Sequence, residues 1–328
     1  MQPPPSPTSA PAAPAALLDP AALAAALAAR LPAAPRTRFA PSPTGYLHLG
    51  HVANAVWVWG LARALGGRVL LRLEDHDRGR CRPEYEAALL DDLDWLGLLP
   101  DEPATDHFRT GAPSPYRQSD NDAVYDAALA RLAGAYAVYA CACSRREIAR
   151  LVPTAAHAEP HYPGTCRTRG LAREAGRGVR LVLAPGEERF VDGVVGAQAQ
   201  APAEQCGDLL LRDRLGQWTY QFAVVVDDLR HGVDLVVRGQ DLLASTGRQI
   251  RLARMLGRDA PPVFAHHPLI LKPSGDKLSK ASGDTALREL RAAGATPERV
   301  LGEAAWRTGL LAAMRPVEAG EVGVLFRG

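Results

Sequence analysis

The chain has 328 residues, of which 47% are hydrophobic, and a formal net charge of +2. A chain of this length can bury a large core as one large or two smaller domains, and its small net charge does not predict a broad electrostatic field for nucleic acid. No stretch is apolar enough over the length needed to span a membrane. Five unevenly spaced cysteines argue against a disulfide framework and favour a reducing compartment, the cytoplasm.

Residues 1–35 are rich in alanine and proline. They lack the positively charged start of a signal peptide, because the first basic residue is Arg30. Residues 17–31 could form an alanine-rich helix, but the segment as a whole is predicted to be a flexible arm, to which we assign no function.

The most informative stretch is 36–51, RTRFAPSPTGYLHLGH. A short extended run passes into Pro-Ser-Pro-Thr-Gly, which cannot continue as regular helix or strand, and an apolar periodic run over 52–65 predicts a helix. The free N–H groups and the dipole at the start of such a helix form an anion site. His48 and His51, one turn apart with Gly50 between them, could therefore reach a bound phosphate.

Residues 67–77, GRVLLRLEDHD, predict a buried strand that ends in acidic residues. Glu74 falls at its carboxyl end, where an open parallel sheet presents its binding edge. We favour a ligand role for Glu74, such as holding an α-ammonium group, over a solvated acidic turn. Helices are expected at 83–96 and at 116–134, the second entered through Ser119 and Asp120.

Three cysteines follow within a short span: Cys141 and Cys143 in a Cys-Ala-Cys pair, then Cys166 after Tyr-Pro-Gly-Thr. This pattern indicates a structural zinc site. The alternative is three reduced, buried thiols without a metal. For the fourth ligand, His157 and His161 are the better intrinsic donors, and tyrosine is a rare one.

Residues 208–239 predict a hairpin, a helix that starts near Tyr220 and ends before Gly232, and a strand over 233–238. Arg238 ends that strand, again at the binding edge, and a helix over 241–256 follows.

Residues 268–282, PLILKPSGDKLSKAS, predict a strand, a turn and a basic loop. All lysines of the chain, Lys272, Lys277 and Lys280, fall in this region, whereas arginine is the cation everywhere else. Because a lysine ammonium is compact and mobile, this loop is a second candidate for phosphate chemistry.

These motifs together resemble the class I aminoacyl-tRNA synthetases, in the form of the glutamyl-tRNA synthetases. Residues 38–50 match that family's R-F-A-P-S-P-T-G-x-L-H-x-G throughout, and KLSKA resembles its "KMSKS" loop. Residues 116–134 resemble the Q-S-x-R-x-x-x-Y helix, with Asn121 in place of arginine, and 67–77 resemble R-x-E-D-T-D, with His76 in place of threonine. The resemblance covers about 36–293, with the motifs in the family's order.

The resemblance implies an α/β fold: a doubly wound parallel-sheet nucleotide-binding domain of the Rossmann type, split by an inserted zinc-bearing α/β subdomain. The implied divisions are a flexible arm (1–35), the first catalytic half (36–115), the acceptor-binding insertion (116–206), the second catalytic half (207–265), and the KLSKA loop with a short helical end (266–328). The segment from Lys280 to residue 328 is too short to form an independent domain. No anticodon-binding domain is therefore expected.

The family branch most similar to this pattern is that of truncated glutamyl-tRNA synthetase paralogues, which activate L-glutamate with ATP and Mg2+ and transfer it to queuosine in the anticodon loop of tRNA(Asp). The resemblance implies catalysis by His48, His51, Lys277 and Lys280, with ATP contacts from His48, His51 and Lys280. It implies glutamate binding by Arg38, Phe39, Ala40, Pro41, Ser42, Glu74, Tyr220 and Arg238. It also implies one structural Zn2+ held by Cys141, Cys143, Cys166 and, as fourth ligand, Tyr162.

A cytoplasmic monomer without a membrane partner is expected. Two alternatives remain at this stage. A short synthetase that charges the 3′ end of tRNA(Glu) is disfavoured by the missing C-terminal domains. A catalytically silent RNA-binding paralogue is disfavoured by the intact HLGH and KLSK motifs.

Overall fold

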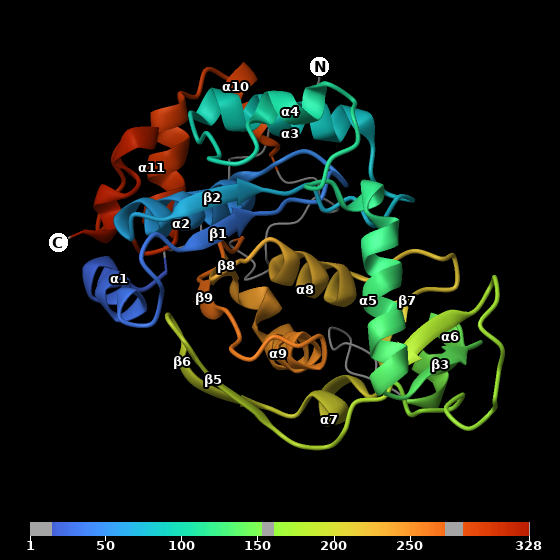
Figure 1. Ribbon diagram of the computed structural model, residues 1–328. Coiled ribbons are helices and arrows are strands. Elements are labelled where there is room, and N and C mark those ends of the chain that lie inside the picture. Colours follow the sequence, from blue (N-terminus) through green and yellow to red (C-terminus); the bar gives the residue numbers. More distant parts are fainter. Residues whose placement is uncertain (1–14, 153–160, 273–284, 328) are drawn as a thin grey trace, which may run out of the picture.

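The computed structural model describes residues 15–152, 161–272 and 285–327, in which helices pack around three sheets (Figure 1). The α-helices are α1 (Pro20–Ala28), α2 (Leu49–Ala64), α3 (Pro83–Leu96), α4 (Thr105–Arg109), α5 (Asp122–Ala135), α6 (Arg145–Leu151), α7 (Pro202–Cys206), α8 (Tyr220–Arg230), α9 (Thr246–Met255), α10 (Leu287–Ala292) and α11 (Pro297–Arg307). Short 3-10 helices are η1 (Gln118–Asp120), η2 (Gln240–Ser245), η4 (Ala319–Glu321) and η5 (Val324–Phe326). The strands are β1 (Arg36–Phe39), β2 (Arg68–Leu71), β3 (Val138–Cys141), β4 (Gly178–Leu181), β5 (Glu188–Asp192), β6 (Gly196–Gln200), β7 (Leu209–Arg212), β8 (Leu235–Gly239) and β9 (Val263–His267). Within these described ranges, no helix combines the length and the apolar character needed to cross a bilayer.

The central strands form mixed rather than purely parallel sheets. β1 pairs with β2 in parallel, and β9 pairs in parallel with both β8 and β5. β6 adds an antiparallel edge to β5. β1 lies against β8, and the N–H of Asp234 donates to the carbonyl oxygen of Arg36 at 2.9 Å. The carboxyl ends of β1, β8 and β9 therefore lie close together, as binding edges of α/β sheets do.

A separate antiparallel sheet of order β3-β4-β7 lies beyond α5, on the right in Figure 1. The strand pairing crosses the divisions expected from the sequence. The expected insertion, 116–206, included β5 and β6, yet both belong to the sheet of β8 and β9. β7 was expected in the second catalytic half, yet it pairs with β4. Strand pairing joins segments that are distant in sequence, so linear motif order does not reveal it.

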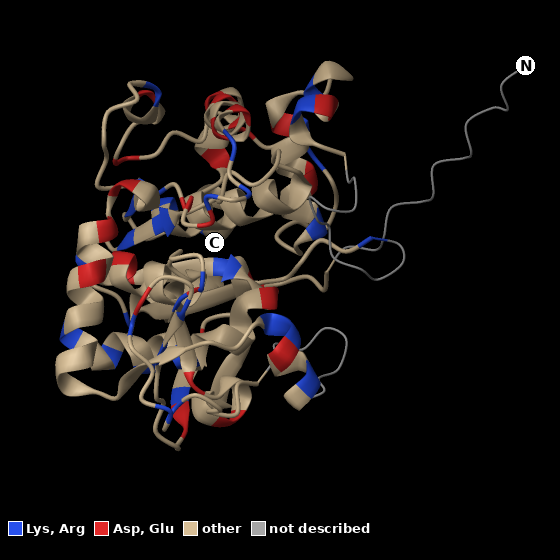
Figure 2. Cartoon of the chain, turned by 90° about the vertical axis from the view of Figure 1, so that its right-hand side faces the viewer, with Lys and Arg blue, Asp and Glu red and all other residues tan. Residues whose placement is uncertain are grey.

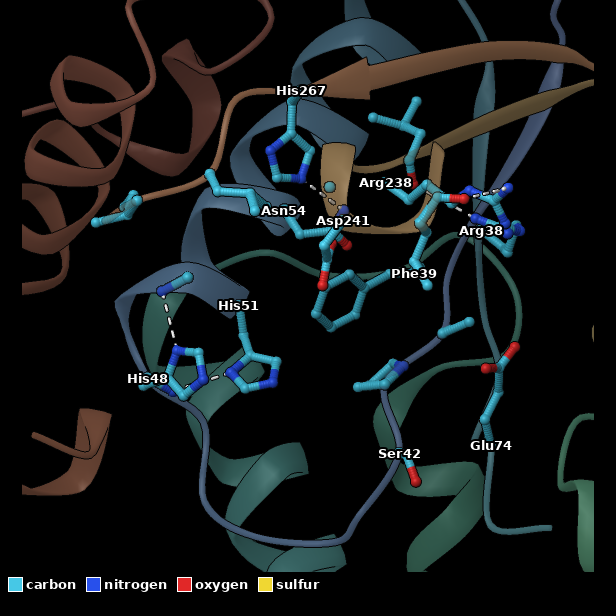
Figure 3. A pocket seen from close by; sticks show the side chains of 18 of the residues that line it. Arg38, Phe39, Ser42, His48, His51, Asn54, Glu74, Arg238, Asp241 and His267 are labelled. Carbon is cyan, nitrogen blue, oxygen red and sulfur yellow. Dashed lines mark hydrogen bonds between the residues drawn. The ribbon is translucent and has the colours of Figure 1, made fainter. Parts of the chain in front are cut away.

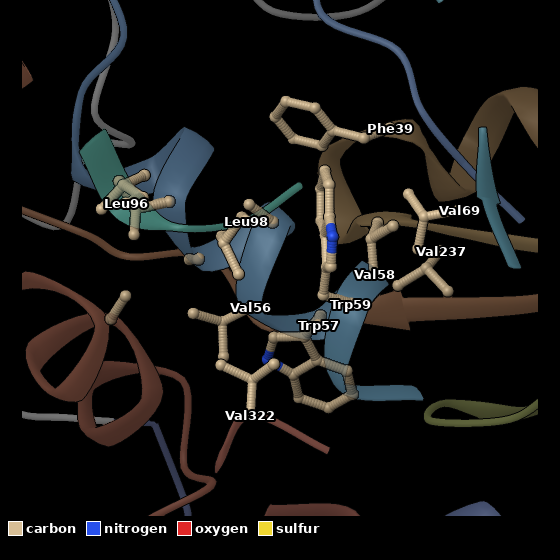
Figure 4. Close-up of a cluster of buried hydrophobic side chains, with 14 of the residues drawn as sticks. Phe39, Val56, Trp57, Val58, Trp59, Val69, Leu96, Leu98, Val237 and Val322 are labelled. Atoms are coloured by element: carbon tan, nitrogen blue, oxygen red, sulfur yellow. The ribbon is translucent and has the colours of Figure 1, made fainter. Parts of the chain in front are cut away.

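Helix α2 forms the centre of the hydrophobic core (Figure 4). It is apolar on nearly every face, as a helix buried on all sides must be. Its two tryptophans satisfy their indole N–H groups: Trp57 donates to Thr308 Oγ1 and Trp59 donates to the carbonyl oxygen of Leu99, each at 3.0 Å. The burial of α2 fixes the position of its N-terminus, which carries the HLGH motif.

Residues 15–35 do not form the flexible arm that the sequence predicted. Leu27 of α1 is fully buried. The N–H groups of Ala15 and Leu18 donate to the carbonyl oxygens of Arg307 and Gly309, at 3.1 and 3.0 Å. The alanine- and proline-rich composition conceals a few leucines that pack on the core, and these leucines order the segment.

The remaining elements follow the expected pattern with small shifts. α3 covers 83–96 as predicted, and α8 ends before Gly232, which adopts a left-handed φ of 61°. The strand expected to begin at Pro268 ends there instead, because proline lacks the N–H that would extend the ladder. Acidic and basic residues alternate over the side drawn in Figure 2, in keeping with the small net charge.

Candidate active site

A pocket of about 370 Å3 opens where β1, β8 and β9 end and α2 begins (Figure 3). The pocket contains every described residue that the sequence assigned to catalysis, ATP or glutamate: Arg38, Phe39, Ala40, Pro41, Ser42, His48, His51, Glu74, Tyr220 and Arg238. Lys277 and Lys280 lie outside the described residues. Figure 3 shows Arg38 and Arg238 on one side of the pocket and the two histidines on the other.

The two histidines are held by the first turn of α2. His48 is the N-cap residue with extended backbone (φ −134°), and its Nδ1 accepts a hydrogen bond from the N–H of Gly50 at 3.1 Å. His51 Nδ1 accepts in turn from the N–H of His48 at 3.1 Å. With Nδ1 an acceptor in both rings, each neutral imidazole carries its proton on Nε2. The start of the helix thus combines the positive end of the helix dipole with two ring donors, a set suited to an anion.

The HLGH turn is also held from the C-terminal part of the chain. The N–H of Leu287 donates to the carbonyl oxygen of Leu47 at 2.7 Å, and His48 forms a β-bridge with Ala286. The guanidinium of Arg288 lies 3.6 Å from the centre of the Tyr46 ring. These contacts join the start of α10 to the start of α2.

A buried charge network underlies the opposite side of the pocket. Arg38 Nε donates to Asp228 Oδ1 at 3.1 Å, and Arg72 donates to Asp228 Oδ1 and to Glu74 Oε1, each at 2.8 Å. Arg72 is fully buried, and it was not identified from the sequence. The sequence held a signal, because Arg72 directly follows β2 and lies between two leucines, Leu71 and Leu73, and a buried charge requires partners.

Burial alone would raise the pKa of Asp228, but the charges of Arg38 and Arg72, with their hydrogen bonds, bring that pKa below its ordinary value. Burial alone would lower the pKa of Arg72, yet the charges of Asp228, Glu74 and Asp227 raise it. Asp228 and Arg72 therefore stay ionised at neutral pH. The network places the Glu74 carboxylate at the pocket wall with one oxygen already bound.

Arg238 is placed differently. Its side chain is buried, and it donates to His266 Nε2 at 2.9 Å, to Gln249 Oε1 at 2.7 Å and to Thr246 Oγ1 at 2.9 Å. Among the residues that the structure describes, no carboxylate forms an ion pair with it. Burial lowers the pKa of Arg238. A buried cation with only uncharged acceptors is suited to an incoming carboxylate.

Tyr220 begins α8 and faces the same pocket. Burial raises the pKa of its hydroxyl, with the charge of Glu74 acting in the same direction, so the phenol is neutral and can donate or accept a hydrogen bond. The segment from Phe39 to Ser42 is held to the next strand, since the N–H groups of Arg72 and Glu74 donate to Phe39 and Pro41 at 3.0 and 3.1 Å.

Several pocket residues escaped the sequence reasoning. Asn54 Nδ2 lies 3.1 Å from His267 Nε2, and Asp241 lines the same wall. Burial lowers the pKa of His267 to about 4, so that ring is neutral. Asn54 lies about one turn beyond His51 and Gly50, and helical periodicity places residues three and four apart on the same face; this signal could have identified it.

The departures from the family motifs have structural partners. Asn121, in the place of arginine, donates to the carbonyl oxygens of Ser114 and Arg117 at 2.8 and 2.6 Å and accepts from Arg230 at 2.9 Å. His76, in the place of threonine, lies 2.7 Å from Gln118 through Nδ1. Both side chains thus connect the start of α5 to the catalytic core.

A second site lies at the end of β3. The sulfur atoms of Cys141, Cys143 and Cys166 lie within 4.8 Å of one another. The phenol oxygen of Tyr162 lies 3.2 Å from Cys141 Sγ and 3.8 Å from Cys143 Sγ, and it accepts the N–H of Cys166 at 3.0 Å. Zn–S bonds of about 2.3 Å in a tetrahedral site require sulfur separations a little under 4 Å, so the arrangement fits a metal after slight contraction.

Tyr162, rather than His161, lies beside the three sulfur atoms. In the searched, described part of the chain, His161 is not a member of the metal-type cluster, and His157 lies outside the described residues. The guanidinium of Arg180 lies 3.6 Å from the centre of the Tyr162 ring, where its charge would favour a phenolate. Burial nevertheless raises the pKa of Tyr162, as does its contact with Cys141, so a phenolate there requires a cation beside it.

Comparison with known proteins agrees with this geometry. Residues 35–313 match the family described as "tRNA synthetases class I (E and Q), catalytic domain". A "Glutamyl-Q tRNA(Asp) synthetase" of Symbiobacterium thermophilum is 43% identical over 301 residues, covering 88% of this chain and 91% of that protein. A protein of the same name from Burkholderia cenocepacia is 46% identical over 257 residues, covering 77% of this chain and 82% of the relative.

Among solved structures, the glutamate-tRNA synthetase from Elizabethkingia anophelis superposes with a TM-score of 0.71 at 28% identity. The match covers 89% of this chain but only 65% of that longer protein. The family match spans most of the chain and includes all the pocket elements. The chain therefore belongs to the class I tRNA synthetases of the E and Q type, and it is a ligase of that family.

Proposed function

We propose that the chain activates L-glutamate with ATP to form glutamyl-adenylate and then transfers the glutamate to queuosine in the anticodon loop of tRNA(Asp). The observation that carries this proposal is the single pocket in which a buried guanidinium without an acidic partner, Arg238, faces the anion-binding start of α2. The names of two relatives that are more than 40% identical support the choice of tRNA(Asp).

The two arginines suit the two carboxylates of glutamate. Within the described chain, the hydrogen-bond partners of Arg238 are all uncharged, so its positive charge is not neutralised. Arg38 shares its charge with Asp228 and lines the same pocket. Glu74 and the Tyr220 hydroxyl would hold the α-ammonium, and the backbone from Phe39 to Ser42 would complete the pocket. Such a set accepts glutamate and rejects glutamine, because glutamine leaves a buried cation unpaired.

Activation needs no protein nucleophile. A glutamate α-carboxylate oxygen attacks the α-phosphorus of ATP in line, and the bond to the bridging oxygen breaks as pyrophosphate leaves with Mg2+. Catalysis then consists of positioning and of stabilising charge on the phosphate oxygens. His48 and His51 would donate from Nε2. Lys277 and Lys280 keep the same role on the basis of sequence alone.

We also propose that Cys141, Cys143, Cys166 and Tyr162 hold one structural Zn2+. The bound ion would tie the end of β3 to the Tyr162–Cys166 loop and so order the antiparallel sheet of the insertion. In this division, a Rossmann-type catalytic unit binds ATP and glutamate, and the insertion contacts the RNA. We place the protein in the cytoplasm, as a monomer, with its tRNA substrate.

The small net charge of +2 supports recognition of a limited RNA segment, since it provides little overall attraction for a whole tRNA. Unstacked loop nucleotides can be recognised by shape and base edges alone. The test is transfer of labelled glutamate to tRNA(Asp) with and without queuosine, followed by mapping of the labelled nucleotide. An isolated anticodon stem-loop with queuosine should accept glutamate, and the same stem-loop with guanosine should not.

The second candidate is charging of the tRNA 3′ end, which the structural similarity to a glutamate-tRNA synthetase favours. Removal of the 3′ CCA separates the two. If trimmed, queuosine-containing tRNA(Asp) no longer accepts glutamate, the acceptor is the terminal ribose. Absence of glutamate-dependent ATP–pyrophosphate exchange, even with tRNA present, would instead indicate a catalytically silent paralogue.

A further inference from the structure

Arg238 is the end of a buried chain of hydrogen bonds that reaches a different part of the sequence. Its Nε–H donates to His266 Nε2 at 2.9 Å, and His266 Nδ1 lies 2.6 Å from Asp192 Oδ2. The side chains of His266 and Asp192 are fully buried. His266 is on β9 and Asp192 ends β5, two strands that pair in parallel at this point.

The hydrogen bonds determine which nitrogen of His266 carries the proton. Arg238 Nε is always a donor, so His266 Nε2 must be an acceptor, and the proton resides on Nδ1 and is donated to Asp192. Burial lowers the pKa of His266, and the nearby charge of Arg238 does the same, which keeps the ring neutral.

Hydrogen bonds to both of its carboxylate oxygens hold the side chain of Asp192 in one orientation. Its Oδ1 accepts the N–H groups of Val194, Val195 and His266 at 2.9, 3.0 and 3.2 Å, while Oδ2 faces the imidazole. Burial alone would raise the pKa of Asp192, but its hydrogen bond with His266 and these N–H groups bring it below the ordinary value. A carboxylate so held can only accept, and it orients the ring.

We propose that Asp192 and His266 are positioning residues for substrate binding: they lock the Arg238 guanidinium, through a neutral imidazole, in the plane that receives a carboxylate of glutamate. The inference rests on the proposed function, because it takes the Arg238 ligand to be glutamate. A carboxylate in direct contact with Arg238 would hold it equally well but would compete with the substrate for its charge. A histidine between the two orients the cation and keeps the competing anion one residue away.

Asp192→Asn tests this arrangement with almost no change in shape. The three backbone N–H groups require oxygen at the Oδ1 position, so the amide nitrogen of the variant faces His266 Nδ1. That contact makes Nδ1 an acceptor and moves the ring proton to Nε2, where it opposes the Nε–H of Arg238. Asp92→Asn is the matched control, because Asp92 is also a buried aspartate but lies on α3.

His266→Leu and His266→Gln form a second pair. Both lose the stacking of the ring on Phe264, whose centroid is 6.0 Å away. Only Gln retains an acceptor near the Nε2 position. If acceptor chemistry rather than packing is required, Gln should preserve glutamate binding better than Leu.

The experiment measures KM for glutamate, KM for ATP and kcat in ATP–pyrophosphate exchange with the full-length chain. We expect Asp192→Asn and His266→Leu to raise KM for glutamate on the order of tenfold or more, as for loss of a hydrogen bond to a charged group. KM for ATP should stay within about twofold, His266→Gln should lie between, and Asp92→Asn should match the wild type. Equal rises in both KM values, or equal effects of Leu and Gln, would overturn the proposal.

A spectroscopic measurement tests the Asp192–His266–Arg238 hydrogen-bond chain independently of the proposed function. Nitrogen-15 NMR of the imidazoles should show His266 protonated at Nδ1 in the wild type and at Nε2 in Asp192→Asn. If the wild type neither exchanges pyrophosphate nor binds glutamate by calorimetry, the proposed function fails. NMR still shows whether His266 is protonated at Nδ1, as the hydrogen-bond chain requires. If His266 of the wild type is protonated at Nε2, the proposed positioning role of Asp192 and His266 is overturned.

Discussion

From the buried network around Asp228 we predict that Asp228→Asn lowers the free energy of unfolding. Asp228→Asn removes the carboxylate shared by Arg38 and Arg72, at 3.1 and 2.8 Å. Removal of one partner from a buried ion pair costs about 3–5 kcal/mol. Within the described chain, Arg72 keeps its partner Glu74 at 2.8 Å, and Arg38 keeps the carbonyl oxygen of Val237 at 3.4 Å. We therefore expect the lower end of the range, about 3 kcal/mol.

The assay is urea unfolding at pH 7.5, with the free energy of unfolding compared between the wild type and Asp228→Asn. The pKa of Asp228 is lowered in the folded state from the model-compound value of 3.8. Its contribution is therefore present above that value and is lost as the pH falls through the folded pKa. The difference between the two proteins should persist at pH 5 and disappear only in stronger acid.

Asp92→Asn serves as the control of opposite sign. Burial, only partly opposed by the charge of Arg291, raises the pKa of Asp92 from 3.8 to about 7. Its contribution to stability is lost as the pH rises between those values, so the variant should equal or exceed the wild type at pH 7.5. The reasoning would be refuted if Asp228→Asn cost less than about 1 kcal/mol, or if both variants lost the same amount.

Three further predictions concern the candidate sites. His48→Asn keeps an acceptor for the N–H of Gly50, 3.1 Å from Nδ1 in the wild type, so stability should be retained while pyrophosphate exchange falls ~10²–10³-fold through loss of the Nε2 donor; unchanged exchange would remove His48 from the mechanism. Metal analysis of protein purified without chelator should give about one zinc per chain, and Cys143→Ser should lose it and destabilise the insertion. A well-folded, metal-free wild type would contradict that site, and retention of zinc in Tyr162→Phe would exclude Tyr162 as a ligand. Arg238→Gln should narrow the preference for glutamate over glutamine in the exchange assay, and equal exchange with both amino acids in the wild type would contradict the pocket.

The sequence by itself determined the local features of the site. Turn residues and helical periodicity placed His48 and His51 at the start of α2, and the cysteine spacing identified the three thiols that cluster at the end of β3. Glu74 and Arg238, which the sequence placed near strand ends, both line the pocket. These features depend on neighbouring residues, so patterns of a few positions are sufficient to predict them.

The tertiary structure decided how distant segments meet. Pairing of β5 with β9 brings Asp192 to His266, and the fold brings Asp228 of α8 to Arg72, which follows β2. The same long-range packing orders α1, whose composition alone predicted a flexible arm. Local propensity carries no information about which strands become neighbours, because that choice depends on burial and hydrogen bonding summed over the whole chain. The residues that orient the arginines of the pocket were therefore recognised only when the folded chain placed them side by side.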